Sequence, residues 1–155
     1  MKHCTALTAA LILTALAATA HAAGPEIHAC DFKIKARCVK GDASVTLTDG
    51  KVTRLVVDVY WCGLPGRPGY SCLIDSSRGD NDAKWSEAGG ATIIDNAMPT
   101  NPTDPDRVKV TVGQEVSIDF AEAQSLGRCG AGAELPRTIV IPAKKAACRV
   151  QLGEP

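Results

Sequence analysis

The sequence predicts a mainly β protein, a small antiparallel β-sandwich or barrel with one short helix and three disulfides. Apolar and polar residues alternate with a period of two along most of the chain, which is typical of strands with one buried face. Glycine- and proline-rich segments divide the chain into runs of strand length. Six cysteines follow an apolar leader, and an even number of cysteines in an exported chain indicates disulfides.

The first 22 residues have the pattern of a cleavable secretory signal. Lys2 supplies the positive start, and an uncharged run of Ala, Leu, Ile and Thr extends from Ala6 to Ala20. This run is too short for a bilayer span, and Ala20-His21-Ala22 is a small-x-small cleavage pattern. We therefore expect cleavage near Ala22, a single disulfide-stabilised domain of residues 23–155, and a periplasmic or secreted location.

Cleavage changes the chemistry that the chain carries. It removes Cys4, His3 and His21, so the mature chain keeps six cysteines and one histidine. No C-x-x-C pair of a zinc site is present in the sequence, so we expect all six cysteines to form disulfides. They are Cys30, Cys38, Cys62, Cys72, Cys129 and Cys148.

Three strands are predicted in the N-terminal half of the domain. Apolar residues alternate with charged ones over residues 30–38, which indicates one half-buried strand with a basic outer face. A second strand, starting at Val45, ends at Asp49-Gly50, a dipeptide typical of a two-residue type I′ hairpin turn. The returning strand, residues 52–60, contains a Leu-Val-Val run, so we expect it to be buried on both faces.

Further short strands and the helix are predicted in the C-terminal half of the domain. Apolar residues alternate on both sides of Gly113-Gln114-Glu115, which indicates a hairpin. They are Val108, Val110 and Val112 before the turn and Val116, Ile118 and Phe120 after it. The segment from Asp119 to Leu126 has the pattern of a short helix with Asp119 as its N-cap. Other strands are expected at residues 70–75, 91–95, 138–141 and 148–152.

Strand geometry limits the disulfide pairing. Eight extended residues would separate Cys30 from Cys38 by roughly 26 Å, whereas bridged Cα atoms lie within about 7 Å of each other. We therefore exclude a Cys30–Cys38 bridge. Cys62 and Cys72 flank a loop between adjacent strands, so we expect these two to pair. Cys30 and Cys38 would then pair with Cys129 and Cys148 in either combination.

The mature chain is poor in catalytic side chains. His28 is its single histidine and lies near the N-terminus, where we expect a loose segment unsuited to a general base. With the cysteines in disulfides no free thiol remains, so we predict no catalytic residue, no metal site and no cofactor. The spacing Asp80-Asn81-Asp82 is found in calcium loops, but the loop glycine and the final glutamate are missing. Weak calcium binding stays an open alternative.

The charge of the mature chain narrows the class of partner. Without Lys2 it has 16 basic and 17 acidic residues, a net charge of −1, which disfavours nucleic acid as a partner. Residues 75–106 carry seven acids against two bases, and these loops would form an acidic patch if they meet at one end of the fold. After signal cleavage we expect no stable membrane insertion.

The loop between Cys62 and Cys72 is the strongest candidate for a binding surface. Aromatic and arginine side chains often dominate interfaces, and a braced loop loses little entropy on binding. A competing interpretation is that the aromatic side chains belong to the core and the loop is inert. The expected partner-binding residues are Trp61, Leu64, Arg67 and Tyr70, with Asp80 and Asp82 of the acidic loops.

These features favour a binding domain over an enzyme. We expect an exported protein-binding module, with an inhibitor or immunity-type protein acting on a secreted hydrolase as the leading form and a basic protein as its partner. In outline the plan is similar to periplasmic inhibitor and immunity proteins, including lysozyme inhibitors. One alternative is a structural component of an envelope assembly. Another is a carbohydrate-binding or carbohydrate-active domain that uses Trp61 or Trp85 with the carboxylates of Asp75, Asp80, Asp82, Glu87 and Asp95.

Overall fold

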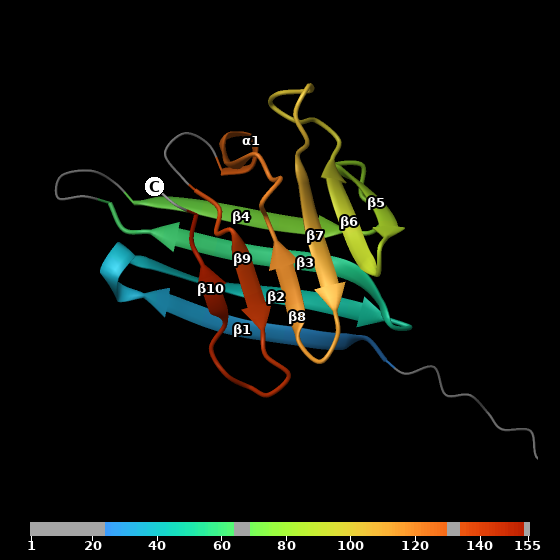
Figure 1. The fold of residues 1–155 in the computed structure, drawn as a ribbon, viewed down its shortest axis with the longest axis horizontal. Helices are drawn as coiled ribbons and strands as arrows, with labels where there is room; N and C mark the ends of the chain where they lie inside the picture. Colours follow the sequence, from blue (N-terminus) through green and yellow to red (C-terminus); the bar gives the residue numbers. More distant parts are fainter. Residues whose placement is uncertain (1–23, 64–68, 130–133, 154–155) are drawn as a thin grey trace, which may run out of the picture.

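Two antiparallel sheets packed face to face form the protein in a computed structural model, which describes residues 24–63, 69–129 and 134–153 (Figure 1). The strands of one sheet cross those of the other at a steep angle in this view. The two sheets stay separate and do not close into a barrel. The predicted mainly β fold is thus confirmed, in its sandwich form.

Both sheets are meanders in which strands that follow each other in the chain lie side by side. The chain passes from the first sheet to the second between β4 and β5. The first sheet has the order β1 (Glu26–Ile34), β2 (Val39–Thr48), β3 (Lys51–Trp61) and β4 (Tyr70–Ser77). The second has β5 (Ala83–Ala88), β6 (Ala91–Asn96), β7 (Arg107–Val112), β8 (Val116–Asp119), β9 (Thr138–Ile141) and β10 (Arg149–Gln151), with β5 and β10 at its edges.

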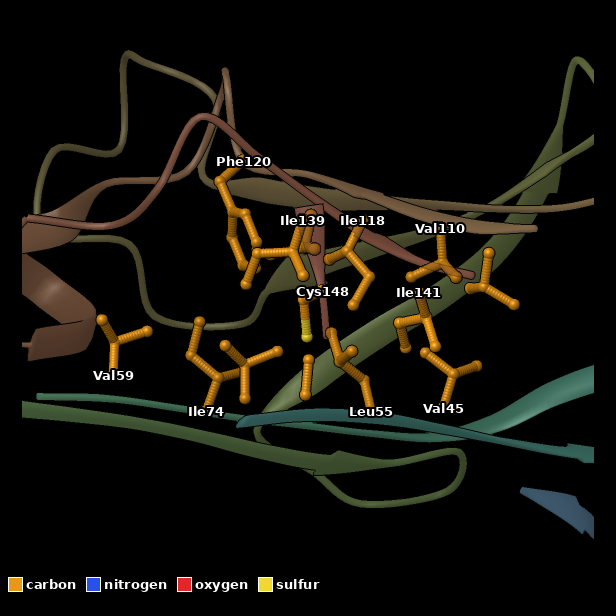
Figure 2. Packing of buried hydrophobic residues seen from close by; sticks show 14 of the residues in the cluster. Val45, Leu55, Val59, Ile74, Val110, Ile118, Phe120, Ile139, Ile141 and Cys148 are labelled. Carbon is orange, nitrogen blue, oxygen red and sulfur yellow. The ribbon is translucent and has the colours of Figure 1, made fainter. Parts of the chain in front are cut away.

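Aliphatic side chains from the two inner faces fill the space between the sheets. Figure 2 shows Val45 and Leu55 of the first sheet meeting Val110 and Ile141 of the second. Complete burial of one such side chain stabilises the fold by about 1.5–3 kcal/mol. Among the described residues the fully buried aliphatic side chains include Leu55, Ile94, Ile118, Ile139 and Ile141, and the buried aromatic ones are Phe32 and Phe120.

The first predicted strand is too long. β1 ends at Ile34, and a 3-10 turn, Lys35–Arg37, reverses the chain into β2. Cys38 closes the turn in the left-handed conformation with φ of 49°. Ile34 then lies opposite Val39 in the hairpin. The alternation of residues 35–38 therefore belongs to a turn, and the basic outer face predicted for one strand is divided between β1 and this turn.

The predicted hairpin turn at Asp49-Gly50 is confirmed. Asp49 and Gly50 have φ of 52° and 73°, and a type I′ turn requires positive φ at both central positions. The strand that follows differs from its prediction. In β3 Val57 and Val59 are buried whereas Asp58 between them is exposed, so only one face is buried.

Two elements in the part of the chain that follows β4 differ from prediction. The helix α1 spans Ser125–Cys129 and does not begin at Asp119. Asp119 ends β8, and its Oδ1 accepts a hydrogen bond of 2.8 Å from the Ala121 backbone N–H, which forms a turn. β5 was not predicted, because its residues are mostly exposed and lack an apolar run. The hairpin of β7 and β8 agrees with prediction.

The three disulfides are Cys30–Cys148, Cys38–Cys62 and Cys72–Cys129. A Cys30–Cys38 bridge is absent as expected, although the single extended strand from which we excluded it ends at Ile34. The expected Cys62–Cys72 pair is wrong, and so is the pairing of Cys38 with Cys129 or Cys148. Cys72 lies opposite Val59 and points into the core, whereas Cys62 is exposed beyond the end of β3. There the Cys62 backbone N–H donates to the Cys38 carbonyl at 3.0 Å. The two cysteines that flank the loop thus face different directions.

Two of the bridges join the sheets at the two edges of the first sheet. Cys30–Cys148 joins β1 to the segment before β10, and Cys72–Cys129 joins β4 to α1. The Cys148 backbone N–H also donates to the Asp31 carbonyl at 2.8 Å. Three disulfides are typical of a protein of an oxidising, extracellular compartment. In the part of the chain that the structure describes, no helix has both the length and the apolar character needed to cross a membrane.

The disulfides are expected to contribute unequally to stability. The Cys30–Cys148 bridge closes a separation of 118 residues and Cys38–Cys62 one of 24. The two enclosed bridges shorten the loop that Cys30–Cys148 closes to about 40 residues, so loop-closure entropy predicts losses of about 4 and about 3.5 kcal/mol when each bridge is removed. Denaturant unfolding of the Cys30→Ala/Cys148→Ala and Cys38→Ala/Cys62→Ala variants measures the difference. A larger loss for the second variant would contradict this order.

Candidate functional site

The residues of the predicted loop site lie only partly within the described structure. Trp61 and Tyr70 are directly opposite each other in β3 and β4, at the base of the loop. Trp61 is half-buried and packs against the core, whereas Tyr70 is 40% exposed. Leu64 and Arg67 lie outside the described residues.

The predicted acidic members of that site lie elsewhere. Asp80 and Asp82 follow the far end of β4, and Tyr70 begins the strand. Eight residues of extended chain place these two ends roughly 23 Å apart. The structure therefore does not bring the aromatic and the acidic residues of the predicted site together.

Arginines from several segments neutralise much of the predicted acidic patch. Arg54 binds Asp75 through two hydrogen bonds of 3.0 and 2.7 Å. These bonds lower the pKa of Asp75 below its ordinary value and raise the pKa of Arg54 above its own. The pairs are Arg54–Asp75, Arg78–Glu87, Arg107–Asp95 and Arg128–Asp106. Four of the seven carboxylates that such an acidic patch would contain are therefore neutralised by arginines.

Asp106 is the centre of a buried polar cluster at the end of the second sheet. Its carboxylate is fully buried and accepts hydrogen bonds from Arg128 Nε at 2.6 Å, Asn96 Nδ2 at 2.7 Å and the Gln124 backbone N–H at 3.0 Å. Burial raises the pKa of Asp106, but these hydrogen bonds outweigh it and hold the pKa below its ordinary value. The cluster ties β6, the loop before β7 and α1 together, so we assign it a structural role.

Arg78 and Trp85 form a second structural contact, at the crossing from the first sheet to the second. The Arg78 guanidinium lies 5.4 Å from the centre of the Trp85 ring and pairs with Glu87. Its Nε donates to the Val52 carbonyl at 3.2 Å. One face of the Trp85 ring is thus covered, which leaves less aromatic surface for stacking on a sugar.

A small polar cavity lies beside β4, with a volume of about 180 Å³. Asp82, Asn96 and Arg128 line it together with Ser76. The Ser76 side chain is buried, and its Oγ has no hydrogen-bond partner among the described residues. In this cavity Asp75 and Asp82, two carboxylates of the predicted carbohydrate site, meet other polar groups.

His28 lies in a strand, so the expected loose N-terminal segment is wrong at this position. It belongs to β1, is half-buried, and pairs in register with Val45 of β2. Its Nε2 is 3.0 Å from Glu26 Oε1. All six cysteines of the described residues are disulfide-bonded, so none of them has a free thiol to pair with this histidine.

The outer face of the first sheet carries charges of one sign in rows. Asp31, Asp42 and Asp58 lie directly opposite one another on β1, β2 and β3, and all three are exposed. We call them the aspartate row. Two positions along the strands Lys33 lies opposite Lys40, forming the lysine row. Among the described residues none of these five side chains forms an ion pair.

The outer face of the second sheet shows the opposite arrangement. Lys109 lies opposite Asp119, and Asp95 lies between Lys84 and Arg107 on its two neighbouring strands. Opposite charges in such cross-strand pairs stabilise a sheet, and like charges destabilise it. The aspartate row is therefore expected to lower the stability of the domain.

Sequence reasoning missed the aspartate row because the row depends on strand register. Its members are 11 and 16 residues apart in the chain, and none lies in the acidic segment of residues 75–106. The alternation of Asp58 with Val57 and Val59 does show that this aspartate faces outward. Only the pairing of three strands places Asp31, Asp42 and Asp58 side by side.

The described side chains do not form a metal centre. Within residues 24–63, 69–129 and 134–153, no group of three or more His, Cys, Asp and Glu side chains is arranged to hold an ion. The Asp80 carboxylate accepts a hydrogen bond of 3.1 Å from the Ser77 backbone N–H, which stabilises the turn after β4.

The fold and this surface define a disulfide-stabilised β-sandwich domain with an unusual outer face. No protein-family model, no curated protein and no solved structure matches the chain. Its function is therefore argued from the surface and the chemistry of its own side chains.

The buried ion pair makes a prediction about acid sensitivity. Replacing Arg128 by Met leaves the Asp106 carboxylate buried without its cation, which is expected to lower the free energy of unfolding by about 3–5 kcal/mol at pH 7. Because the folded-state pKa of Asp106 is lowered, its contribution is present above its ordinary pKa and is lost as the pH falls. The cost of Arg128→Met should therefore shrink toward acid pH. Denaturant unfolding across pH measures this, with Arg54→Met, at an exposed pair, as the control that changes little.

Removing charge from the aspartate row is predicted to raise the free energy of unfolding, whereas Arg128→Met lowers it. Replacing Asp42 and Asp58 together by Asn removes like-charge repulsion and is expected to raise the free energy of unfolding by about 0.2–1 kcal/mol. High salt should reduce the gain, because it screens exposed charges. Thermal and denaturant unfolding measure it. Asp119→Asn removes a charge facing Lys109 and should instead lower the free energy of unfolding. An equal loss of stability in Asp42→Asn/Asp58→Asn and in Asp119→Asn would contradict the argument.

Proposed function

We propose that the chain is an exported, non-catalytic domain that binds a basic region of another protein through the outer face of its first sheet. The observation that carries the proposal is the aspartate row, three exposed carboxylates in register on neighbouring strands that form no ion pair with any other described residue. A partner that presents lysine or arginine side chains would relieve the repulsion within the row. Electrostatic complementarity of this kind directs partner choice and speeds association.

Exposed side chains of the sort that stabilise interfaces lie next to the row. Tyr60 is 38% exposed and Leu73 is 61% exposed. Leu73 lies opposite Asp58, and Tyr60 is two residues further along β3. Aromatic and aliphatic groups surrounded by polar residues are the usual composition of a binding surface.

The surface is held in place before any partner binds. It lies on consecutive strands of one sheet, and the Cys38–Cys62 bridge joins the β1–β2 turn to the end of β3. Little conformational entropy is therefore lost on binding. A rigid, charged face on a small exported domain is suited to an inhibitor or immunity-type protein that blocks a secreted hydrolase.

Export belongs to the same proposal. The leader pattern of residues 1–22 and the three disulfides support a periplasmic or secreted protein that is released by cleavage near Ala22. The lack of a free thiol in the mature chain supports a binding role over thiol catalysis.

A carbohydrate-binding role is the second candidate, and the polar cavity beside β4 favours it. The Asp82 carboxylate and the Ser76 Oγ, which has no hydrogen-bond partner among the described residues, offer hydrogen bonds to a small hydroxylated ligand. The covered face of Trp85 weighs against stacking on a sugar ring. We therefore place this role second to protein binding.

The test is capture of a defined partner by the immobilised mature protein. A panel of secreted hydrolases, with basic lysozymes and acidic enzymes of similar size, is offered at low and at high salt. We expect the basic members to be retained at low salt only, because exposed charges attract weakly when screened. Asp42→Asn/Asp58→Asn should weaken capture by at least about tenfold, or 1.4 kcal/mol.

A matched variant controls for net charge. Asp49→Asn/Glu134→Gln removes the same two negative charges at exposed positions away from the aspartate row and should leave capture unchanged. Equal loss in both double variants would show that only overall charge matters. Retention of acidic enzymes, or of no enzyme, would overturn the proposal.

A further inference from the structure

An open and mainly apolar pocket lies at the end of the first sheet, where the β1–β2 hairpin turns. Its volume is about 280 Å³. Ile34 and Val39, the last cross-strand pair of the hairpin, line it together with the Cys38–Cys62 bridge. Val39 is buried and Ile34 half-buried, so both are anchored in the core and the pocket is preformed.

Three lysines complete the lining of this hairpin pocket. They are Lys33, Lys35 and Lys40, and all are exposed. Among the described residues none of them forms an ion pair. The Lys40 ammonium lies 4.9 Å from the centre of the Tyr60 ring, a contact that limits where this charge can move. Three lysines that form no ion pair among the described residues therefore surround an apolar hollow.

We propose that the hairpin pocket binds a single-chain anionic amphiphile, a free medium-chain carboxylate. The hydrocarbon chain lies against Ile34, Val39 and the disulfide, where its burial removes apolar surface from water. The carboxylate lies at the rim beside the lysines, where it remains partly hydrated and attracts their charges. Neither a short carboxylate nor an alkyl cation satisfies both parts of the pocket.

The size of the pocket favours one short chain. A dry cavity of about 150 Å³ holds benzene, so a pocket of about 280 Å³ accommodates on the order of ten non-hydrogen atoms. This is close to the alkyl chain of decanoate. The 3-10 turn beside the pocket consists of Lys35, Ala36 and Arg37 and carries no large apolar side chain to insert into a bilayer. The free amphiphile is therefore favoured over a membrane surface.

The hairpin pocket is distinct from the aspartate row, although Lys33 and Lys40 border both surfaces. A ligand in the pocket would neutralise these lysines. That would leave the aspartate row as the dominant charge of the outer face. The two proposals stand on different residues, so either can fail without the other.

The experiment is calorimetric titration of the mature protein at low salt with decanoate below its micelle concentration. Decyltrimethylammonium has the same chain with the opposite charge, and acetate has the carboxylate without the chain. We expect decanoate to bind at one site, at least about tenfold more tightly than the alkyl cation, and acetate not to bind. Equal affinity for decanoate and the alkyl cation would overturn the proposal, because the lysines would then play no part.

Variants locate the site. Lys33→Gln/Lys40→Gln should weaken decanoate binding roughly tenfold, whereas Lys51→Gln/Lys145→Gln, at exposed lysines outside the pocket lining, should not change it. Ile34→Trp should block the pocket, with its folding checked by thermal unfolding. If that variant fails to fold, the lysine variants still decide. Unchanged binding in Lys33→Gln/Lys40→Gln would overturn the assignment.

Two further measurements separate the competing outcomes. Asp42→Asn/Asp58→Asn should retain decanoate binding, which distinguishes the pocket from the surface proposed to bind a protein. Phosphatidylglycerol vesicles are offered in a sedimentation assay. Binding to vesicles without binding of monomeric decanoate would overturn the proposal in favour of a membrane-surface role.

Discussion

Burial of a single face of each sheet is the constraint from which the other features of this domain follow. The inner faces are almost entirely branched aliphatic, and they leave water only when the two sheets pack together. Because strand side chains alternate, each residue between two inward-facing ones must point to solvent. Asp58, between Val57 and Val59, has no other orientation available. The core therefore determines the composition of the outer surface as well.

Disulfides and ion pairs stabilise the packing of the two sheets at their edges. The side chains on the outer face of the first sheet therefore contribute little to holding the fold together. Cys30–Cys148 and Cys72–Cys129 lie at its two edges, and the Asp106–Arg128 cluster fixes the connections of the second sheet. With few aromatic side chains in the core, these links supply stability that packing alone would provide in a larger domain. Because this outer face is not needed for stability, it tolerates like charges in register. Its side chains can therefore be selected for binding a partner.

The fold was predictable from local pattern, and the candidate surfaces were not. Alternation and the Asp49-Gly50 turn are local signals, and they correctly predicted a mainly β antiparallel fold while leaving the choice between sandwich and barrel open. The Cys62–Cys72 prediction failed because proximity in the chain does not reveal which way each side chain faces. The aspartate row and the arginine partners of the acidic loops depend on contacts between distant segments. The hairpin pocket was hidden because residues 30–38 read as one strand, and the pocket exists only where that segment turns.

The nesting of the disulfides has a consequence for the order in which the chain oxidises. Cys38–Cys62 and Cys72–Cys129 each join cysteines that are consecutive in the sequence, and Cys30–Cys148 encloses both. Cys30 is synthesised long before Cys148, and Cys38 is the next cysteine after it in the sequence. An oxidase that joins thiols in the order in which they appear would form a non-native Cys30–Cys38 bridge. The later cysteines would then also pair with the wrong partners. Maturation of the domain therefore calls for thiol–disulfide exchange, by an isomerase or by a reducing buffer, until the last strand has arrived.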